Sequence, residues 1–195
     1  MNKAQYRSCL RERLQALTPQ QRKHKSRQAC HHLIHTSFFQ EASMVMMYLA
    51  MSEELDLADA MRVAWEQGKE VVVPLVSWRD RTMIPVRLPS LDEPLIKDAH
   101  GLWHPEEPAP VPVERIDLVV TPGLGFDTQG HRLGRGGGFY DRFFAGIRTR
   151  VLRLAVAFSE QVLDDLPVDD SDEPVDGLVT EQGLIVPVGM TRKES

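Results

Sequence analysis

A short apolar run followed by a glycine-rich loop is the feature that most constrains the fold of this chain. Residues 116–120 (IDLVV) predict a buried strand, which the segment TPG at 121–123 ends. Four of the five residues 134–138 are glycines, and aromatic side chains follow at helical spacing from Phe139. This order of strand, glycine loop and helix start forms a natural anion site. Glycine lets the backbone approach a ligand closely, and the first N–H groups of a helix point at it.

Three charged residues indicate that the anion is a phosphate. Arg132 and Arg135 add guanidinium groups, whose fork geometry suits phosphate oxygens. Asp141 would need a cation between its carboxylate and a phosphate, which suggests Mg²⁺. The alternative is a glycine-rich turn that only connects a strand to a helix, but the two arginines and the aspartate favour phosphate binding. The loop is not a Walker loop, because no Lys-Ser/Thr pair follows the glycines, and its spacing is not that of a Rossmann fingerprint.

The segment 122–141 closely resembles the signature of the 5-formyltetrahydrofolate cyclo-ligase family. In that family the pattern is P-G-L-A/G-F-D-x-x-G-x-R-L-G-x-G-x-G-Y/F-Y-D. The residues of this chain that fit it are Pro122, Gly123, Phe126, Asp127, Gly130, Arg132, Leu133, Gly134, Gly136, Gly138, Tyr140 and Asp141. Some members carry lysine where this chain has Gly137, so any phosphate contact from that lysine is absent here.

Length and composition predict one globular domain. The chain has 195 residues, of which 42% are hydrophobic and 26% charged. Its apolar runs are too short to span a membrane, and its N-terminus lacks the apolar core of a secretory signal. We therefore expect a cytoplasmic monomer with a single domain over 1–195, with N-terminal helices in 1–36 packed on a sheet and a tail at 189–195. Only two cysteines are present, both in predicted helices, so no disulfide framework is expected.

The net charge of −5 conceals a basic N-terminal segment, since residues 1–36 hold eight Lys/Arg and one acidic residue. Such a segment could suggest nucleic acid. However, the charges are interleaved with a helical apolar stripe, and no aromatic stacking platform accompanies them. A basic face around an anionic small-molecule site explains them equally well. The expected partners are small molecules, with neither nucleic acid nor a membrane.

The first predicted helix, residues 2–17, carries a basic row of Lys3, Arg7 and Arg11 beside an apolar stripe. Spacing alone favours a solvated face for this row. The family has an N-terminal K-x-x-x-R that contacts ATP, and Lys3 and Arg7 occupy those places. The resemblance therefore implies that both residues bind ATP.

Two further segments carry candidate folate-binding residues. The family's M-x-x-E-hydrophobic-D/E segment lies at the folate site, and Met51, Glu54, Leu55 and Asp56 match it. Asp56 could instead cap the helix that follows it, and Met51 could be a core residue. The long loop 89–112 holds six of the thirteen prolines and includes Trp103. In this family that loop helps to cover the folate, so Trp103 could stack on the ligand or simply anchor the loop.

Asp176 is a second candidate metal ligand. The aspartate could be a turn residue, but the family has V-D-x-x-V/L at this place, where the aspartate is the second Mg²⁺ carboxylate. With phosphate oxygens and waters, Asp141 and Asp176 would form a plausible site for a hard cation.

Strands that alternate with helices predict an α/β domain whose mainly parallel sheet has helices on both faces. The resemblance implies a Rossmann-like three-layer α/β/α fold. It also implies the ATP- and Mg²⁺-dependent cyclisation of 5-formyltetrahydrofolate to 5,10-methenyltetrahydrofolate, with release of ADP and phosphate. The catalytic residues would be Arg135, which neutralises charge on the transferred phosphoryl group, and Asp141.

The resemblance gives each ligand its own set of residues. ATP would be bound by Lys3, Arg7, Arg132, Leu133, Gly134, Arg135, Gly136, Gly137, Gly138, Phe139 and Tyr140. The folate pocket would be shaped by Met51, Asp56, Trp103 and Tyr140. Two other classes of protein remain as alternatives. One is a non-catalytic nucleotide- or folate-binding protein. The other is a sugar-phosphate isomerase, which would need a general base at the sheet end and no Mg-ATP.

Overall fold

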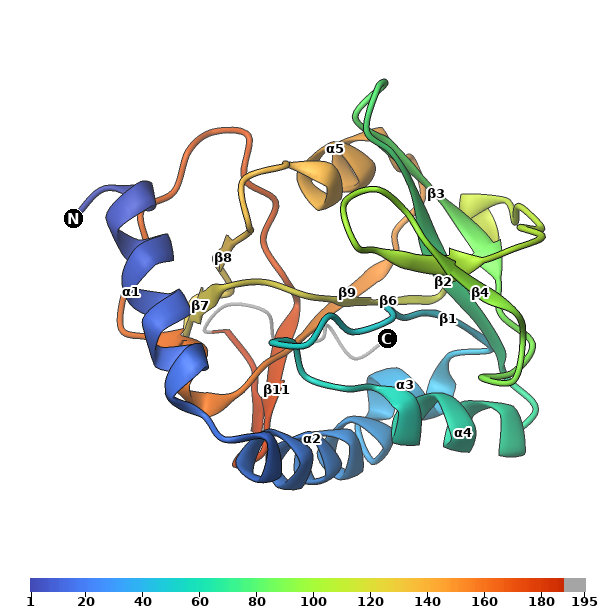
Figure 1. Ribbon diagram of the computed structural model, residues 1–195, viewed down its shortest axis with the longest axis horizontal. Coiled ribbons are helices and arrows are strands. Elements are labelled where there is room, and N and C mark those ends of the chain that lie inside the picture. Colours follow the sequence, from blue (N-terminus) through green and yellow to red (C-terminus); the bar gives the residue numbers. More distant parts are fainter. Residues whose placement is uncertain (188–195) are drawn as a thin grey trace, which may run out of the picture.

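The computed structural model describes residues 1–187 (Figure 1). In chain order the elements are α1 (Lys3–Ala16), α2 (Pro19–Ile34), α3 (Ser37–Glu41), β1 (Met44–Met46), α4 (Ala58–Glu66), β2 (Glu70–Ser77), β3 (Thr82–Arg87), β4 (Leu95–Lys97), β5 (Trp103–Pro105), the 3₁₀ turn η1 (Val113–Arg115), β6 (Leu118–Thr121), β7 (Gly125–Asp127), β8 (Arg132–Leu133), α5 (Phe139–Gly146), β9 (Leu152–Val156), the 3₁₀ turn η2 (Ser159–Gln161), β10 (Val162–Leu163), β11 (Gly177–Thr180) and β12 (Gly183–Ile185).

A seven-stranded sheet crosses the centre of the protein in the order β12-β11-β9-β6-β1-β2-β3. The five inner strands are parallel to one another, and the edge strands β12 and β3 are antiparallel to their neighbours. The inner strands read as continuous apolar runs because both of their faces are buried. Pro85 lies in the edge strand β3, where a missing N–H costs least. The predicted α/β class with a mainly parallel sheet is confirmed.

Each face of this sheet carries its own hydrophobic core. Figure 1 shows α2, α3 and α4 on one side of the sheet and α5 on the other. On the first face, Val45, Val71 and Leu118 pack against the N-terminal helices. On the opposite face, Met46 and Val119 join a second cluster with the aromatic side chains of α5. Alternation along each strand therefore sends successive side chains into different layers, as the three-layer fold requires.

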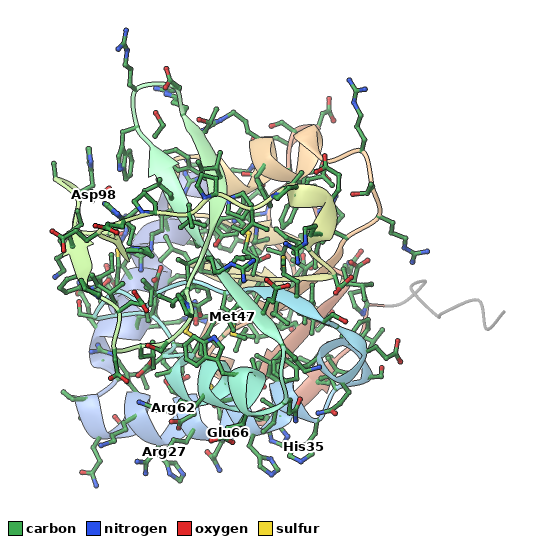
Figure 2. All side chains as sticks on the ribbon, turned by 90° about the vertical axis from the view of Figure 1, so that its right-hand side faces the viewer. Arg27, His35, Met47, Arg62, Glu66 and Asp98 are labelled. Atoms are coloured by element: carbon green, nitrogen blue, oxygen red, sulfur yellow. The ribbon has the colours of Figure 1, made fainter. Side chains whose placement is uncertain are left out.

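The N-terminal helices begin at capping boxes that their sequences encode. The side chain of Thr18 accepts a hydrogen bond from the N–H of Gln21, and the Gln21 side chain accepts one from the N–H of Thr18. Asn2 and Gln5 form the same reciprocal pair at the start of α1. Such a pair satisfies two N–H groups that the helix leaves open. In Figure 2, Arg27 and Arg62 lie on the outer surface of α2 and α4, whereas Met47 lies in the interior, where it is fully buried.

The central strand β1 is short and covers only Met44–Met46. The loop 89–112 contains the hairpin β4–β5. The tail expected at 189–195 lies outside the described residues. None of the helices in the described part of the chain is long and apolar enough to cross a membrane.

The order of the strands creates a crevice between two neighbours. From β1 the chain passes through α4 to β2 on one side, whereas from β6 it passes through α5 to β9 on the other side. The loops that leave β1 and β6 therefore diverge at the carboxyl edge of the sheet. Ligands of open α/β sheets bind at such a switch point, which defines where the site should lie.

Candidate active site

A cavity of about 450 Å³ lies at the switch point between β1 and β6. Its walls come from the segment after β1, the ends of β2 and β3, the loop after β6, the start of α5 and the hairpin β4–β5. Its lining includes Tyr48, Met51, Glu54, Trp78, His100, Trp103, Arg132, Gly134, Arg135, Gly137, Gly138, Phe139, Tyr140 and Asp141. Mostly apolar walls with a few convergent polar groups are typical of a small-molecule site.

The glycine loop presents unpaired backbone donors at this cavity. Its carbonyl oxygens are bound from outside: Arg7 Nε donates to the oxygen of Gly134 (2.9 Å), and Arg142 Nη2 donates to that of Gly137 (2.6 Å). In contrast, the N–H groups of residues 134–141 donate to no other group of residues 1–187. Gly136 and Gly138 have φ of 112° and 62°, which suits glycine alone. A run of unpaired N–H groups that ends at a helix N-terminus is a phosphate-binding arrangement.

Arg132 lies beneath this loop with its side chain only 4% exposed. Its Nη2 donates to Oδ1 of Asp141, and its guanidinium lies 5.5 Å from the centroid of the Tyr140 ring. The Nε of Arg132 and the hydroxyl of Tyr140 are buried without a hydrogen-bond partner among the described residues. Buried polar groups of this kind are rare in native proteins. Because both residues line the cavity, these two donors are candidates for hydrogen bonds to a bound ligand.

Arg135 reaches from the glycine loop to the segment after β1. Its Nε donates to Oε1 of Glu54 (3.1 Å), and its Nη1 lies 3.9 Å from Oε2 of Glu53. The side chain of Glu54 is 11% exposed, and its Oε2 accepts the N–H of Met51 (3.0 Å). This ion pair joins the two loops that diverge from the switch point.

Tyr48, which is buried, and Tyr140, which is partly buried with a buried hydroxyl group, flank Glu54. Burial raises the pKa of Tyr48 and of Tyr140 well above the usual value for a phenol, and the nearby negative charge of Glu54 raises both further. Their hydroxyl groups therefore remain protonated at neutral pH. The cavity thus combines a carboxylate acceptor with two phenol groups that can donate.

A model of the 5-formyltetrahydrofolate cyclo-ligase family matches residues 1–181. The chain belongs to this family. It is 30% identical over 186 residues to the 5-formyltetrahydrofolate cyclo-ligase of Mus musculus, a match that covers 90% of this chain and 91% of that relative. The enzyme of the same name from Escherichia coli K12 is 27% identical over 183 residues, covering 88% and 96% of the two chains. As a cyclo-ligase the protein is an enzyme, an ATP-dependent ligase.

A solved structure agrees with this assignment. The 5,10-methenyltetrahydrofolate synthetase of Aquifex aeolicus, determined by NMR, superposes with a TM-score of 0.82 at 31% identity. The superposition covers 100% of this chain and 97% of the other. The three-layer α/β fold expected from the resemblance is thereby confirmed.

Glu54 lines this cavity, whereas Asp56 does not. Asp56 is exposed, and its Oδ1 accepts the N–H of Ala58 (2.9 Å) at the start of α4, although the N-cap residue of this helix is Leu57. It lines a neighbouring open cleft of about 1020 Å³, together with Met51 and Trp103. Sequence reasoning placed Glu54 in the matching motif but gave the site role to its neighbour. The residue spacing alone could not show which of the two acids points inward.

An aromatic wall closes the far side of the cavity. Trp103 is 38% exposed, and Lys97 Nζ lies 4.7 Å from the centroid of its ring. Trp78, in the turn after β2, stacks on His100 at 3.8 Å and meets Phe139 edge-on at 4.9 Å. No sequence pattern singled out Trp78, because its neighbours come from two distant segments, the hairpin β4–β5 and α5.

Lys3 sits at the start of α1 beside an acidic loop. Its Nζ contacts Oδ2 of Asp169 (2.6 Å) and of Asp172 (2.5 Å). Burial alone would raise the pKa of Asp172, but the hydrogen bond and charge of Lys3, a backbone hydrogen bond from Asp169 and the charge of Arg132 together lower it. Lys3 and Arg132 therefore both act on the carboxylate of Asp172, on the side of the protein that carries the glycine loop.

The structure separates the two predicted magnesium ligands along the strand direction. Asp141 lies in the first turn of α5 at the carboxyl edge of the sheet, bonded to Arg132. Asp176 directly precedes β11, at the amino edge, and its Oδ2 accepts the N–H of Arg153 (2.8 Å). Among residues 1–187 no group of three or more His, Cys, Asp or Glu side chains is arranged to hold a metal ion. The pairing of Asp141 with Asp176 stays a prediction.

Proposed function

We propose that this cyclo-ligase uses the cavity at the switch point to convert 5-formyltetrahydrofolate to 5,10-methenyltetrahydrofolate, with release of ADP and phosphate. The observation that carries the proposal is the row of unpaired N–H groups over residues 134–141, in a loop that lines the same cavity as Glu54. The unpaired N–H groups suit a phosphate chain, and the carboxylate of Glu54 suits a ring system with hydrogen-bond donors. The reaction needs both ligands side by side.

ATP is the ligand of the glycine loop in this proposal. Its phosphates accept the N–H groups of residues 134–141, while Arg132 and Arg135 supply charge. Arg7 holds the loop through the carbonyl of Gly134 and carries further N–H donors. Lys3 joins the site when the triphosphate replaces its carboxylate partners in the acidic loop.

Asp141 fits a magnesium ion. Its carboxylate is 21% exposed, and only Oδ1 is engaged by a residue of the described chain. Magnesium usually takes one or two carboxylates together with substrate phosphates and waters, so Oδ2 of Asp141 is a suitable ligand. The ion would supply charge neutralisation on the phosphate oxygens. The family motif implies Asp176 as a second carboxylate, but this role would require Asp176 to reach the ion from the opposite edge of the sheet.

The folate lies against Glu54, Met51, Tyr140 and Trp103 in this proposal. Glu54 is a nearly buried acceptor, suited to the N–H donors of a pterin ring. Trp103 is exposed at the rim of the cavity, where it can stack on an aromatic ring. Asp56, outside the narrow cavity, contacts the part of the substrate that extends into the neighbouring cleft.

Two displacement steps complete the ring. The formyl oxygen attacks the γ-phosphorus of ATP, the bond to the bridging oxygen breaks, and ADP leaves. N10 then attacks the activated formyl carbon and loses its proton, while the C–O bond breaks and phosphate leaves. Phosphoryl transfer depends on positioning and charge neutralisation more than on a covalent nucleophile. Arg135 is the side chain of the loop that can move from Glu54 to the developing charge.

The test is the appearance of the conjugated methenyl chromophore when the purified protein is mixed with 5-formyltetrahydrofolate, ATP and Mg²⁺. We expect product that requires ATP and is strongly reduced in an Asp141→Asn variant. Glu66→Gln, an exposed charge change on α4, is the matched control and should retain wild-type activity. Absence of product, with ATP binding still detectable by calorimetry, would leave a non-catalytic binding protein as the better description.

The cytoplasmic location and the monomeric state stay predictions. Cell fractionation would test the location, and gel filtration with light scattering would test the monomeric state. The magnesium requirement is tested in the same chromophore assay by replacing Mg²⁺ with EDTA.

A further inference from the structure

Arg135 is shared between the two halves of the site. It lies on the phosphate loop, yet its guanidinium contacts two acidic residues on the other loop of the crevice, Glu54 at 3.1 Å and Glu53 at 3.9 Å. Glu54 lines the cavity, whereas Glu53 lines only a small adjoining void of about 10 Å³ next to Arg135. Glu53 therefore has no place among the groups that would touch either substrate.

The two carboxylates compete with phosphate for the same guanidinium. A carboxylate and a phosphate both use the planar N–H fork of arginine. While Arg135 is bound to Glu54, its Nε cannot donate to a phosphate oxygen. The Nε–Oε1 bond also takes up one acceptor position of Oε1, and Oε2 already accepts the N–H of Met51, so fewer acceptor positions of Glu54 are open to a folate donor.

The glycine loop offers a way for Arg135 to exchange partners. Arg135 stands between Gly134 and Gly136, and its side chain is 33% exposed. Glycine restricts the backbone least, so a small change at these positions re-aims the side chain. The loop itself remains fixed from outside, through Arg7 on Gly134 and Arg142 on Gly137.

We propose that Glu53 is a positioning residue that holds Arg135 against Glu54 until ATP arrives, and that this exchange couples the binding of the two substrates. When the triphosphate draws Arg135 away, Oε1 of Glu54 regains a second open acceptor position for the folate. ATP therefore increases the affinity for 5-formyltetrahydrofolate, and by thermodynamic linkage the folate increases the affinity for ATP by the same factor. The inference rests on the proposed function for the identity of the two ligands.

The first test measures the dissociation constant of a non-hydrolysable ATP analogue by calorimetry in the presence of Mg²⁺. Glu53→Gln removes one competitor for Arg135, so we expect the analogue to bind about threefold more tightly, the scale of one partly exposed ion pair. A gain of affinity is not what a purely structural loss would give. Glu66→Gln should leave the constant unchanged.

A double-mutant cycle separates positioning from simple removal of a negative charge. In an Arg135→Ala background the effect of Glu53→Gln should vanish, because the guanidinium through which Glu53 acts is gone. An equal gain in both backgrounds would mean that Glu53 acts on the phosphates through space, and it would overturn the proposal. Unchanged or weaker binding in Glu53→Gln would overturn it as well.

The coupling itself is read from 5-formyltetrahydrofolate titrations with and without the analogue. We expect severalfold tighter folate binding in the presence of the analogue for the wild type, and a smaller factor for Glu53→Gln. Equal coupling in both proteins would reject the role of Glu53. These equilibria need no turnover. A protein that binds both ligands with this coupling but forms no methenyl product would refute the proposed function alone.

Discussion

Arg7 in the first helix donates a hydrogen bond from Nε to the carbonyl oxygen of Gly134, at 2.9 Å. This contact joins the N-terminus to a loop 127 residues later in the chain. It binds the carbonyl side of the loop, so the N–H groups that follow are left for a ligand. The helix that carries Arg7 is anchored separately, through the buried side chains of Leu10 and Leu14.

Arg7→Ala should weaken nucleotide binding by about tenfold, the scale of one lost hydrogen bond from a charged group. The change leaves the apolar anchor of the helix intact, so the melting temperature should fall only slightly. Calorimetric titration with an ATP analogue measures the first effect. Arg11→Ala, on the same basic row but exposed, is the control. Equal losses in both variants would show a general charge effect rather than a specific contact.

Arg135→Ala should reduce turnover on the order of 100-fold, as expected when a donor to developing charge is removed. Its ion pairs with Glu53 and Glu54 are partly exposed, so little stability should be lost. The methenyl assay measures the turnover, and a urea titration measures the stability. If turnover and stability fell in proportion, the residue would be structural and its assigned role in phosphoryl transfer would be refuted.

Trp103→Ala should raise the KM for 5-formyltetrahydrofolate by about tenfold, the upper end of what one aromatic contact contributes. The kcat should change less, because Trp103 lies at the rim of the cavity and away from the phosphate loop. Trp103→Phe keeps a ring and should restore most of the affinity. If Phe and Ala behaved alike, Trp103 would be a loop anchor rather than a stacking surface.

Gly130→Ala should destabilise the fold by about 2 kcal/mol or more, because the position has positive φ and a new Cβ would lie 2.6 Å from the carbonyl oxygen of Val175. Backbone atoms cannot move aside as a flexible side chain can. Gly146→Ala, where a new Cβ would meet no atom within 4 Å, should change stability by less than about 1 kcal/mol. Urea denaturation of both variants provides the comparison.

Glu181 should contribute stability that is lost in acid. Burial raises its pKa, but hydrogen bonds from Lys25, Ser159 and the backbone outweigh burial and lower the pKa below its ordinary value of 4.5. A lowered pKa in the folded state gives stability that is present above 4.5 and disappears as the pH falls through the folded value. The difference in unfolding free energy between wild type and Glu181→Gln should therefore shrink from pH 6 to pH 3. A difference independent of pH would contradict this assignment.

The sequence alone determined the class of fold and the location of the phosphate loop. Apolar runs such as 118–121, ended by turn residues, predict strands buried on both faces, and helical apolar periods between them predict a layered α/β domain. The glycine loop at 134–138 could be predicted from the sequence for a related reason. Its function depends on backbone freedom and on neighbouring charges, which are local properties of the chain.

Tertiary structure decided which acidic residue enters the cavity. Glu54 and Asp56 are two positions apart, but Asp56 accepts the N–H of Ala58 whereas Glu54 contacts Arg135. It also decided the environment of Trp78, which depends on contacts with Phe139 and His100 from other loops. Such contacts are set by how distant segments pack. The identity of a residue fixes the chemistry that it can perform, but packing fixes the partner with which it performs it.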